Sequence, residues 1–332
     1  MRNLSIKAKF ILLSVGVVAI LAVMVGIGAY ETRRIVEEQI NTVGLETAKA
    51  GADGVDRYFD QLAAIVENIG VTTGQLIEEY GLCTKALLEP SMVRFLKANE
   101  KAGLLDLYMG FQLSGAFADG TLWIPPADFD PRKRPWYTAA VEADKTVLTA
   151  PYVDAQTKKL IVTVATPVHS KDGHLLGVVG MDVELETLSK RVTGNQLFGK
   201  GYAFLTDAKG LILAHPEAGH ILKSNLAVQG GSVTAEVVEK VGQRLAAGET
   251  GFGDYSFDGN TRRTYFTSCR WGFRYGLTFP METLNAVLRS AAMKQVFLAL
   301  FALLFLAAVL YLVGRSVIRP VNGVSEILKR LA

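Results

Sequence analysis

Cysteine is scarce in this chain, which has two in 332 residues, Cys83 and Cys269. Two cysteines cannot form a disulfide framework, so the sequence is not that of a small secreted domain held together by disulfides. Cys83 lies in a predicted helical stretch and Cys269 in a strand-like run, and we interpret both as unpaired, mostly buried residues. Whether they are ever oxidised depends on the distance between their Cα atoms, which the sequence does not give.

Motifs for catalysis and for metal binding are also missing. The chain has four histidines, and the closest pair, His215 and His220, is separated by a turn with no evident third ligand, so we interpret both as surface or locally hydrogen-bonded side chains. Neither a nucleophile elbow nor a zinc-protease motif occurs. The run 194–200 (GNQLFGK) resembles a phosphate loop, but Gly201 replaces the Ser or Thr that would hold Mg²⁺. We therefore predict no enzyme activity and no cofactor.

Charge is absent from two long apolar stretches, 10–30 and 295–314, which enclose almost the whole chain. Each has about 20 residues, enough for a helix to cross a hydrocarbon core of roughly 30 Å. A cleaved signal peptide with a processing site near Gly28 and Ala29 is the alternative for the first stretch. The stretch is longer than the usual core of a signal peptide, which favours an uncleaved anchor. We predict two transmembrane helices, at 10–30 and 295–314.

Basic residues next to the two stretches predict the orientation, because Lys and Arg are retained on the cytoplasmic side. The N-terminal segment 1–9 and the C-terminal segment 315–332 are therefore expected in the cytoplasm, and residues 31–294 outside it, in the periplasm or the extracellular space. The basic residues elsewhere are scattered and not interleaved with aromatic side chains, so we expect no nucleic-acid partner. The residues that carry the orientation signal are Arg2, Lys7, Lys9, Arg315, Arg319, Lys329 and Arg330.

A long helix is predicted from Tyr30 to about Tyr80, because apolar residues recur at intervals of three or four. Its apolar stripe must pack on the following domain or on the same helix of a second subunit. Five glycines weaken the helix by up to ~1 kcal/mol each relative to alanine, which makes them the positions where local breaks are possible. They are Gly44, Gly51, Gly54, Gly70 and Gly74.

The external segment continues with a helix at 85–100 and then two sets of β-strands. The first set, with one helix at 134–144, belongs to a module at about 81–190, and the second to a smaller module at about 195–280 with an amphipathic helix at 233–247. Hairpin turns such as Asp119-Gly120 indicate antiparallel sheets, so the fold class is α+β. The predicted strands are 104–113, 115–118, 121–124, 148–154, 160–168, 175–183, 202–206, 211–214, 251–257, 264–269 and 273–279.

Three runs in the first module carry a resemblance to a known family: 129–137 (FDPRKRPWY), 151–154 (PYVD) and 180–183 (GMDV). Together with the element order, they resemble the double Cache sensor region of bacterial methyl-accepting chemotaxis receptors, over roughly residues 30–291. The resemblance implies a long N-terminal helix and two PAS-like antiparallel-sheet modules, the larger one distal to the membrane and the smaller one proximal. Residues 315–332, with Pro320, resemble the start of a HAMP linker.

The resemblance also implies a ligand site in the distal module. In Cache modules that sense amino acids, the matching positions bind the ligand, here Arg134, Trp136, Tyr137, Tyr152, Asp154 and Asp182. The residue types suit a zwitterion, because a guanidinium and an indole N–H can bind a carboxylate while carboxylates and tyrosines accept an ammonium. A structural role is the alternative, with a solvated basic turn at 132–134 and aromatic side chains that cover the sheet core. Asp182, in an apolar strand, favours the ligand site, because a buried acid is costly without a partner.

One position departs from the family pattern. Phe129 stands where members of the family have a tyrosine, so one hydroxyl donor to the ligand carboxylate is missing. Losing a hydrogen bond to a charged group costs on the order of 1.5 to 3 kcal/mol if nothing replaces it. Either the affinity is lower, Tyr108 or a water molecule substitutes, or the ligand differs and is a small carboxylate or an amine.

These features predict a homodimeric inner-membrane chemoreceptor that binds a small ligand, expected to be an L-amino acid, and signals through the second membrane helix to cytoplasmic proteins. The alternative is the input region of a sensor histidine kinase or diguanylate cyclase, since no output domain is present in the sequence. An anchored hydrolase is disfavoured because no nucleophile and base are evident. Neither the ligand's side chain, the sign of the response, nor any ligand of the proximal module can be deduced from the sequence.

Overall fold

The computed structural model describes residues 6–80, 85–99, 103–257 and 259–313. The chain divides into two compact units, one of residues 43–280 and the other of residues 1–42 with 281–332. The predicted HAMP start at 315–332, the N-terminal segment before residue 6 and Cys83 lie outside the described residues.

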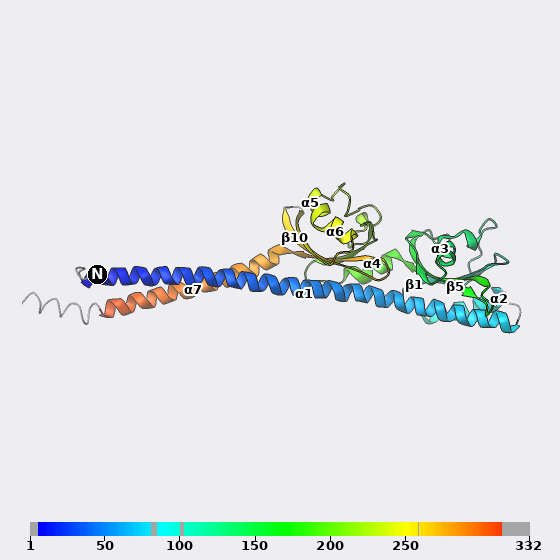
Figure 1. Ribbon diagram of the computed structural model, residues 1–332, viewed down its shortest axis with the longest axis horizontal. Helices are drawn as coiled ribbons and strands as arrows, with labels where there is room; N and C mark the ends of the chain where they lie inside the picture. The colour runs from blue at the N-terminus through cyan, green and yellow to red at the C-terminus, as the bar shows by residue number, and fades with distance from the viewer. Residues whose placement is uncertain (1–5, 81–84, 100–102, 258, 314–332) are drawn as a thin grey trace, which may run out of the picture. The chain divides into compact units, whose positions relative to one another are not determined.

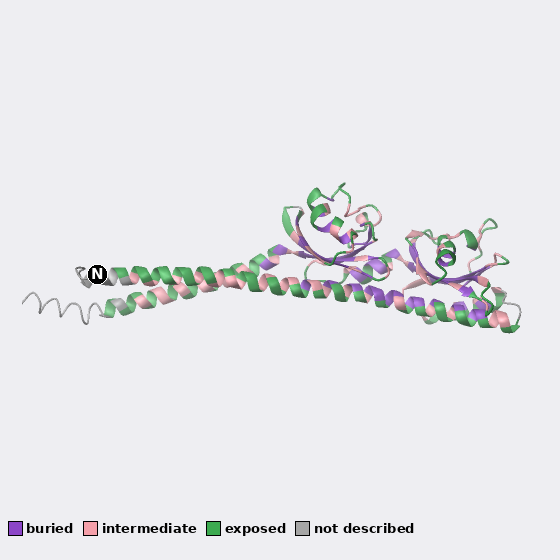
Figure 2. Ribbon diagram, viewed as in Figure 1, coloured by how far each residue is buried: buried purple, intermediate pink, exposed green. Residues whose placement is uncertain are grey.

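Two helices provide the candidate membrane spans. Helix α1 (Ile6–Tyr80) contains the predicted span 10–30, and α7 (Met281–Val313) contains nearly all of 295–314. Both are long and apolar enough to cross a membrane. Their apolar side chains are exposed, for example Phe297 at 65% and Phe301 at 68%, as the green segments in Figure 2 show. Exposed apolar side chains of this number are expected only where lipid or protein covers them.

The unit of residues 43–280 contains two antiparallel sheets (Figure 1). The six-stranded sheet has the order β2-β1-β6-β5-β3, and β4 pairs with β5. Its elements are β1 (Leu104–Phe111), β2 (Phe117–Asp119), the 3₁₀ turn η2 (Pro131–Lys133), α3 (Pro135–Ala143), β3 (Val147–Leu148), β4 (Tyr152–Val153), β5 (Leu160–His169) and β6 (Leu175–Glu184). Helix α2 (Lys85–Ala98) precedes them, and α4 (Leu185–Thr193) follows.

The second sheet has five strands in the order β8-β7-β11-β10-β9. A helical segment covers one face of it, and the fully buried Tyr265 and Tyr275 belong to its core. The elements are β7 (Tyr202–Thr206), β8 (Ile212–Ala214), the 3₁₀ turn η3 (Ala218–His220), α5 (Ala235–Val237), the π-helix η4 (Val238–Gly242), α6 (Gln243–Ala246), β9 (Gly251–Phe257), β10 (Asn260–Ser268) and β11 (Arg274–Pro280). The predicted α+β fold, with a long helix and two antiparallel sheets, is confirmed.

Helix α1 is continuous from Ile6 to Tyr80, and no local break occurs at its glycines. Two of the glycines allow an aromatic ring to lie against the helix backbone. A Cβ at Gly44 would lie 2.4 Å from Cζ of Tyr265, and a Cβ at Gly51 would lie 2.3 Å from Cζ of Tyr275. Because real Cβ atoms do not approach other atoms so closely, both positions require glycine.

Polar contacts attach α1 to the turn between β10 and β11. Both carboxylate oxygens of Asp56 accept from the backbone N–H of Arg270, at 2.9 and 3.0 Å. Asp60 accepts from Nη2 of Arg270 at 2.6 Å and from the indole N–H of Trp271 at 3.0 Å. The helix is thus held both by close packing at its glycines and by charge-assisted hydrogen bonds.

Two local predictions were wrong, and a third was correct except for one turn. Residues 121–124 form no strand, because Leu122 has a positive φ of 62° and two prolines that lack an N–H follow it. The predicted strand 148–154 is two short strands, β3 and β4, separated by irregular backbone. The predicted helix 233–247 contains a π-helical turn, in which Gly242 approaches the carbonyl of Leu226 so closely that a Cβ would lie 1.7 Å from its oxygen.

Candidate functional site

Strands β1 and β6 place three polar side chains at the centre of the six-stranded sheet. Asp106 pairs with Asp182 in the antiparallel register, and Tyr108 pairs with Gly180. Since alternate residues of a strand point to the same face, Asp106 and Tyr108 share a face. A Cβ at Gly180 would lie 2.4 Å from the Tyr108 ring, so this glycine gives the tyrosine room to lie across β6 toward Asp182.

These side chains line a cavity between the sheet, α3 and the loop that follows β2. Seven of the eight predicted site residues lie around it: Tyr108, Phe129, Arg134, Trp136, Tyr152, Asp154 and Asp182. The empty volume of the cavity is about 300 Å³ when its solvent-open mouth is included. The part that can hold the centre of a water molecule is only about 20 Å³, room for about one water. The cavity must therefore widen before it can hold a ligand as large as an amino acid.

Tyr137 is the predicted site residue that does not line this cavity. Its ring is 3% exposed, and its hydroxyl donates to Oε1 of Gln112 at 2.6 Å. A Cβ at Gly110 would lie 3.2 Å from the ring, which therefore packs against the backbone of β1. In this arrangement Tyr137 supports α3 on the sheet and does not face a ligand.

Asp182 is 2% exposed, and its carboxylate has one satisfied and one available oxygen. Oδ1 accepts from the Tyr108 hydroxyl at 2.6 Å and from Oγ1 of Thr163 at 2.5 Å. Oδ2 has no hydrogen-bond donor among the residues that the structure describes. Because Tyr108 gives its proton to Asp182, it has no proton left for a ligand carboxylate and cannot replace the hydroxyl that Phe129 lacks.

Arg134 is a half-buried cation without a carboxylate partner. It follows η2 and precedes α3, and its guanidinium lies over the Phe129 ring, 5.8 Å from the centroid. Within the described ranges, no carboxylate is within 4.0 Å of it. Its neighbour Arg132 differs, because Nε and Nη2 of that side chain donate to the two oxygens of Asp130 at 2.9 and 3.0 Å. Of the two arginines, Arg134 is therefore the one available to bind an anion.

Burial is the largest cause of the raised pKa values of three aspartates, Asp182, Asp106 and Asp119. It raises the pKa of Asp182 to about 7, although the hydrogen bonds from Thr163 and Tyr108 oppose the shift. Burial, with the nearby charges of Asp119 and Asp182, raises the pKa of Asp106 well above its ordinary value. Asp119 also has a raised pKa because of burial. A protonated Asp106 can donate to Asp119, whose Oδ2 is otherwise buried without a donor among the described residues.

The raised pKa of Asp182 predicts a loss of stability as the pH rises. The unfolded chain releases this proton near pH 3.8, whereas the folded chain retains it up to about pH 7. Between these values the free energy of unfolding is expected to fall, by up to about 1.4 kcal/mol per pH unit for one such group. The measurement is the melting temperature of the reconstituted chain from pH 4 to 8. Asp182→Asn should flatten the decline, and an equal slope in both proteins would contradict the assignment.

Five residues that line the cavity were not predicted from the sequence. Asp106 gave the same signal as Asp182, an acid within an apolar strand, and could have been found by it. Trp123 was assigned to a strand that does not exist, so it was not expected to turn inward. The other three, Phe117, Ala155 and Gln156, are residues of ordinary type in a strand and a turn and gave no signal.

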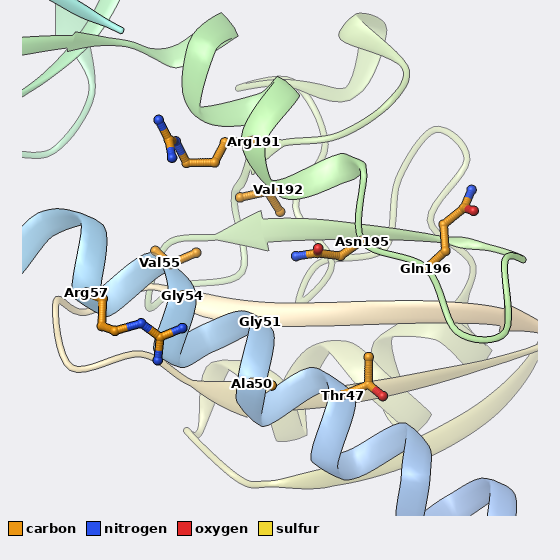
Figure 3. Close-up of a pocket in the computed structure, with 10 residues that line it drawn as sticks. All are labelled: Thr47, Ala50, Gly51, Gly54, Val55, Arg57, Arg191, Val192, Asn195 and Gln196. Carbon is orange, nitrogen blue, oxygen red and sulfur yellow. The ribbon is translucent and has the colours of Figure 1, made fainter. Parts of the chain in front are cut away.

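A second cavity lies between α1 and the C-terminal end of α4, and Figure 3 shows the side chains around it. It is open, with about 400 Å³ of space for water. Arg57 and Arg191 are its charged side chains, and Arg191 lies over the Tyr58 ring, 4.3 Å from the centroid. Because its walls contain no carboxylate, this groove has no acceptor for an ammonium and suits a zwitterion less well than the cavity around Asp182.

Comparison with known proteins places the chain in a family. A family model described as Cache domain (dCache_1) matches residues 31–286, more than half of the chain. The chain belongs to the Cache domain family. Methyl-accepting chemotaxis protein McpA of Pseudomonas putida is 30% identical over 99% of this chain and 49% of its own length. Methyl-accepting chemotaxis protein PctB of Pseudomonas aeruginosa is 27% identical over 90% of this chain and 45% of its own length. The chain thus spans about half the length of these curated relatives.

Solved structures agree with this assignment. The ligand-binding domain of the PctB chemoreceptor in complex with L-Arg has a TM-score of 0.58 and 26% identity, covering 75% of this chain and 91% of that one. The ligand-binding domain of the Pseudomonas fluorescens chemoreceptor CtaA in complex with L-isoleucine has a TM-score of 0.61 and 27% identity, covering 77% and 98%. The predicted Cache family is therefore confirmed. This Cache region is homologous to the ligand-binding domains of amino-acid chemoreceptors.

Proposed function

We propose that this chain is the sensory part of a transmembrane chemoreceptor that binds a free L-amino acid in the cavity of the six-stranded sheet. One observation carries the proposal: Arg134, a cation without a counter-ion, shares a cavity with Asp182, a buried acid that has a free oxygen. A ligand with a carboxylate and an ammonium close together would satisfy both groups at once. The charges of the relatives' ligands, which include L-Arg and L-isoleucine, agree with this pairing.

In the proposed complex, Arg134 binds the ligand carboxylate bidentately. The indole N–H of Trp136, which has no acceptor within the described part of the chain, is the second donor. The free oxygen of Asp182 accepts from the ammonium. Asp154 adds a second negative charge there, although its Oδ2 already accepts from the backbone and hydroxyl of Thr157, both at 2.6 Å. The Tyr152 hydroxyl, 2.6 Å from Oγ1 of Thr163, completes the polar wall.

Entry of the ligand requires the loop of residues 120–130 to move. Trp123 and Phe129 of this loop line the cavity and stack edge to face, with ring centroids 5.2 Å apart. Phe129 also packs on Phe117 of β2 at 5.1 Å. The loop is anchored at its start by Asp119, which accepts from the backbone and hydroxyl of Thr121, both at 2.6 Å. We infer that the ligand binds the open form of the loop and stabilises a closed form around itself.

The test is calorimetric titration of the chain in lipid nanodiscs with the standard L-amino acids, their D-enantiomers, small carboxylates and small amines. We expect saturable binding of one or more L-amino acids, with weaker binding of the D-enantiomer and of the matching acid or amine that lacks one charge. At 100 times its dissociation constant such a ligand adds about 2.7 kcal/mol to the stability, so a rise in melting temperature should accompany the heat. Binding by none of the amino acids would refute the proposal.

An amine is the second candidate ligand, and one observation favours it. Three acids, Asp106, Asp154 and Asp182, line the cavity with a single arginine. If an amine without a carboxylate binds more tightly than every amino acid, the cavity is an amine site, and Arg134 then has another role.

The rest of the receptor follows from this assignment. We propose that α1 and α7 cross the inner membrane, with residues 31–294 in the periplasm, and that two copies form a homodimer. Signalling would pass through α7 to a HAMP linker at 315–332 and a cytoplasmic output domain. Because the relatives are about twice as long and are chemotaxis proteins, chemotaxis is the proposed output, and a sensor kinase or cyclase is the alternative. Crosslinking of single cysteines introduced along α1 tests the dimer.

A further inference from the structure

The module of the five-stranded sheet contains a cavity of its own. The part that can hold the centre of a water molecule is about 60 Å³, more than the 20 Å³ in the cavity around Asp182. Strands β7 and β10 form its base, η3 and the segment after β8 form one side, and α5 forms the other. All of these elements belong to one compact unit. The cavity is therefore an internal feature of the proximal module, separate from the proposed amino-acid site.

Arg262 supplies the positive charge of this cavity. It lies on β10, its guanidinium is 4.5 Å from the centroid of the Phe257 ring, and Nη1 donates to the Tyr202 hydroxyl at 3.3 Å. No carboxylate lies within ion-pair distance of it in the described part of the chain. An arginine that packs on an aromatic ring and lacks a counter-ion is positioned to bind an anion.

His215 supplies a buried hydrogen-bond donor. The residue is 8% exposed, so of the two predicted alternatives it is the locally hydrogen-bonded histidine and not a surface one. Nδ1 accepts from the backbone N–H of Glu217 at 3.0 Å and also lies 3.3 Å from the carbonyl oxygen of the same residue. The shorter contact favours the tautomer that carries its proton on Nε2. Nε2 has no acceptor among the residues described. The His220 ring lies 4.7 Å away, and its Nδ1 is 3.0 Å from Oγ of Ser224, so this second histidine orients the first and contacts the wall.

The charges of the residues that line this cavity favour an anion as its ligand. Glu217 is the cavity's acidic residue, and its side chain is 75% exposed and 3.5 Å from Nε2 of His220. The hydroxyls of Tyr202, Tyr255 and Ser224 are neutral donors. Burial lowers the pKa of His215, and the charge of His220 lowers it further, so at neutral pH His215 is a neutral N–H donor. The cavity therefore combines one fixed cation with several neutral donors and has no buried acid, the opposite of the acid-rich cavity around Asp182.

We propose that this proximal cavity binds a small carboxylate anion, held by the Arg262 guanidinium and the Nε2–H of His215. The size of the cavity admits a ligand of a few heavy atoms once bound water is displaced. The Phe257 ring and Val237 provide an apolar wall for a short alkyl chain. The site is independent of the amino-acid site and does not require that site to be correct.

The test is calorimetric titration of the 332-residue chain in nanodiscs with acetate, propionate and succinate, and with propionamide as the uncharged analogue of propionate. The chain carries Arg134→Ala, so that the cavity around Asp182 contributes no carboxylate binding, and the variants below distinguish the proximal cavity from the groove of Arg57 and Arg191. We expect at least one of the three anions to bind saturably and propionamide to bind more weakly by tenfold or more, because a charge-assisted pair is replaced by a neutral contact. No saturable binding of any of the three, or equal binding of propionamide, overturns the proposal.

Variants then locate the bound anion. Arg262→Gln should weaken its binding about tenfold or more, and Arg262→Lys, which keeps the charge but loses the planar fork, should weaken it less. His215→Gln keeps an N–H donor at the end of the side chain, so this variant should bind the anion more tightly than the His215→Leu variant does. Lys223→Gln is the matched control, because it removes an exposed positive charge outside the cavity and should leave binding unchanged. Melting temperatures without ligand show whether each variant folds, and unchanged binding in a folded Arg262→Gln overturns the proposal.

Discussion

Replacing Arg134 by alanine is expected to weaken amino-acid binding about 100-fold while leaving the stability of the ligand-free chain nearly unchanged. Removing one member of a desolvated, hydrogen-bonded charge pair costs about 3 kcal/mol, which corresponds to about two orders of magnitude in the dissociation constant. In the ligand-free chain, Arg134 has no ion pair to lose, and its ring contact with Phe129 is long. The measurement pairs calorimetric titration with thermal unfolding.

Arg132→Ala is the matched control for this prediction. It removes the same side chain two residues earlier, but that guanidinium is already bound to Asp130, and an exposed pair of this kind contributes only about 0 to 1 kcal/mol. We expect its dissociation constant to stay within threefold of the parent chain. Equal losses of affinity in the two variants would mean that the net charge of the turn matters and that Arg134 has no specific role.

Gly51→Ala is expected to destabilise the unit of residues 43–280 by about 1 to 3 kcal/mol, although alanine is the better helix former. The added methyl group would lie 2.3 Å from Cζ of Tyr275, a fully buried ring whose hydroxyl accepts from Nδ2 of Asn195 at 2.9 Å. To make room, the ring must leave its packed position and lose that hydrogen bond, or α1 must move away from the sheet. The melting temperature of the chain measures the effect.

Gly54→Ala, three residues further along α1, provides the comparison. The nearest atom to its added Cβ is Nη2 of Arg57 at 3.9 Å, so the methyl group meets no obstacle. This variant should be neutral or more stable by up to about 1 kcal/mol, since only the helix propensity changes. The same sign of change in both variants would contradict the packing of Tyr275 on α1.

The fold was largely predictable because its signals are local. Strands 202–206 and 251–257 were predicted with the bounds that the structure has, since each is followed directly by a clear turn sequence, 207–210 and 258–260. The long helix that ends at Tyr80 was predicted from its apolar repeat, but the reason for glycine at positions 44 and 51 was not, because it depends on the rings of Tyr265 and Tyr275, more than 200 residues away. The π-helical turn at 238–242 depends in the same way on the carbonyl of Leu226.

The candidate site was predictable in its residue types more than in its arrangement. Of the eight predicted site residues, seven surround one cavity, and whether they bind a ligand stays a prediction. Tyr137 was included because it matches the family's Arg-x-Trp-Tyr pattern, yet adjacent positions on a helix point in different directions, and its ring packs on β1. The burial of His215 and His220 could not be predicted, since nothing in the sequence of a short turn indicates whether its side chains face the core or the solvent.

The raised pKa of Asp182 makes the chain a proton donor to its buffer. Near pH 7 about half of the molecules carry this proton, and a cation that binds against the carboxyl group favours the ionised form and expels it. A titration in Tris, which absorbs protons with a large heat, should therefore give a different apparent enthalpy from one in phosphate, at the same affinity. The recorded heat contains the ionisation of the buffer, and comparing the two buffers counts the protons released for each ligand bound.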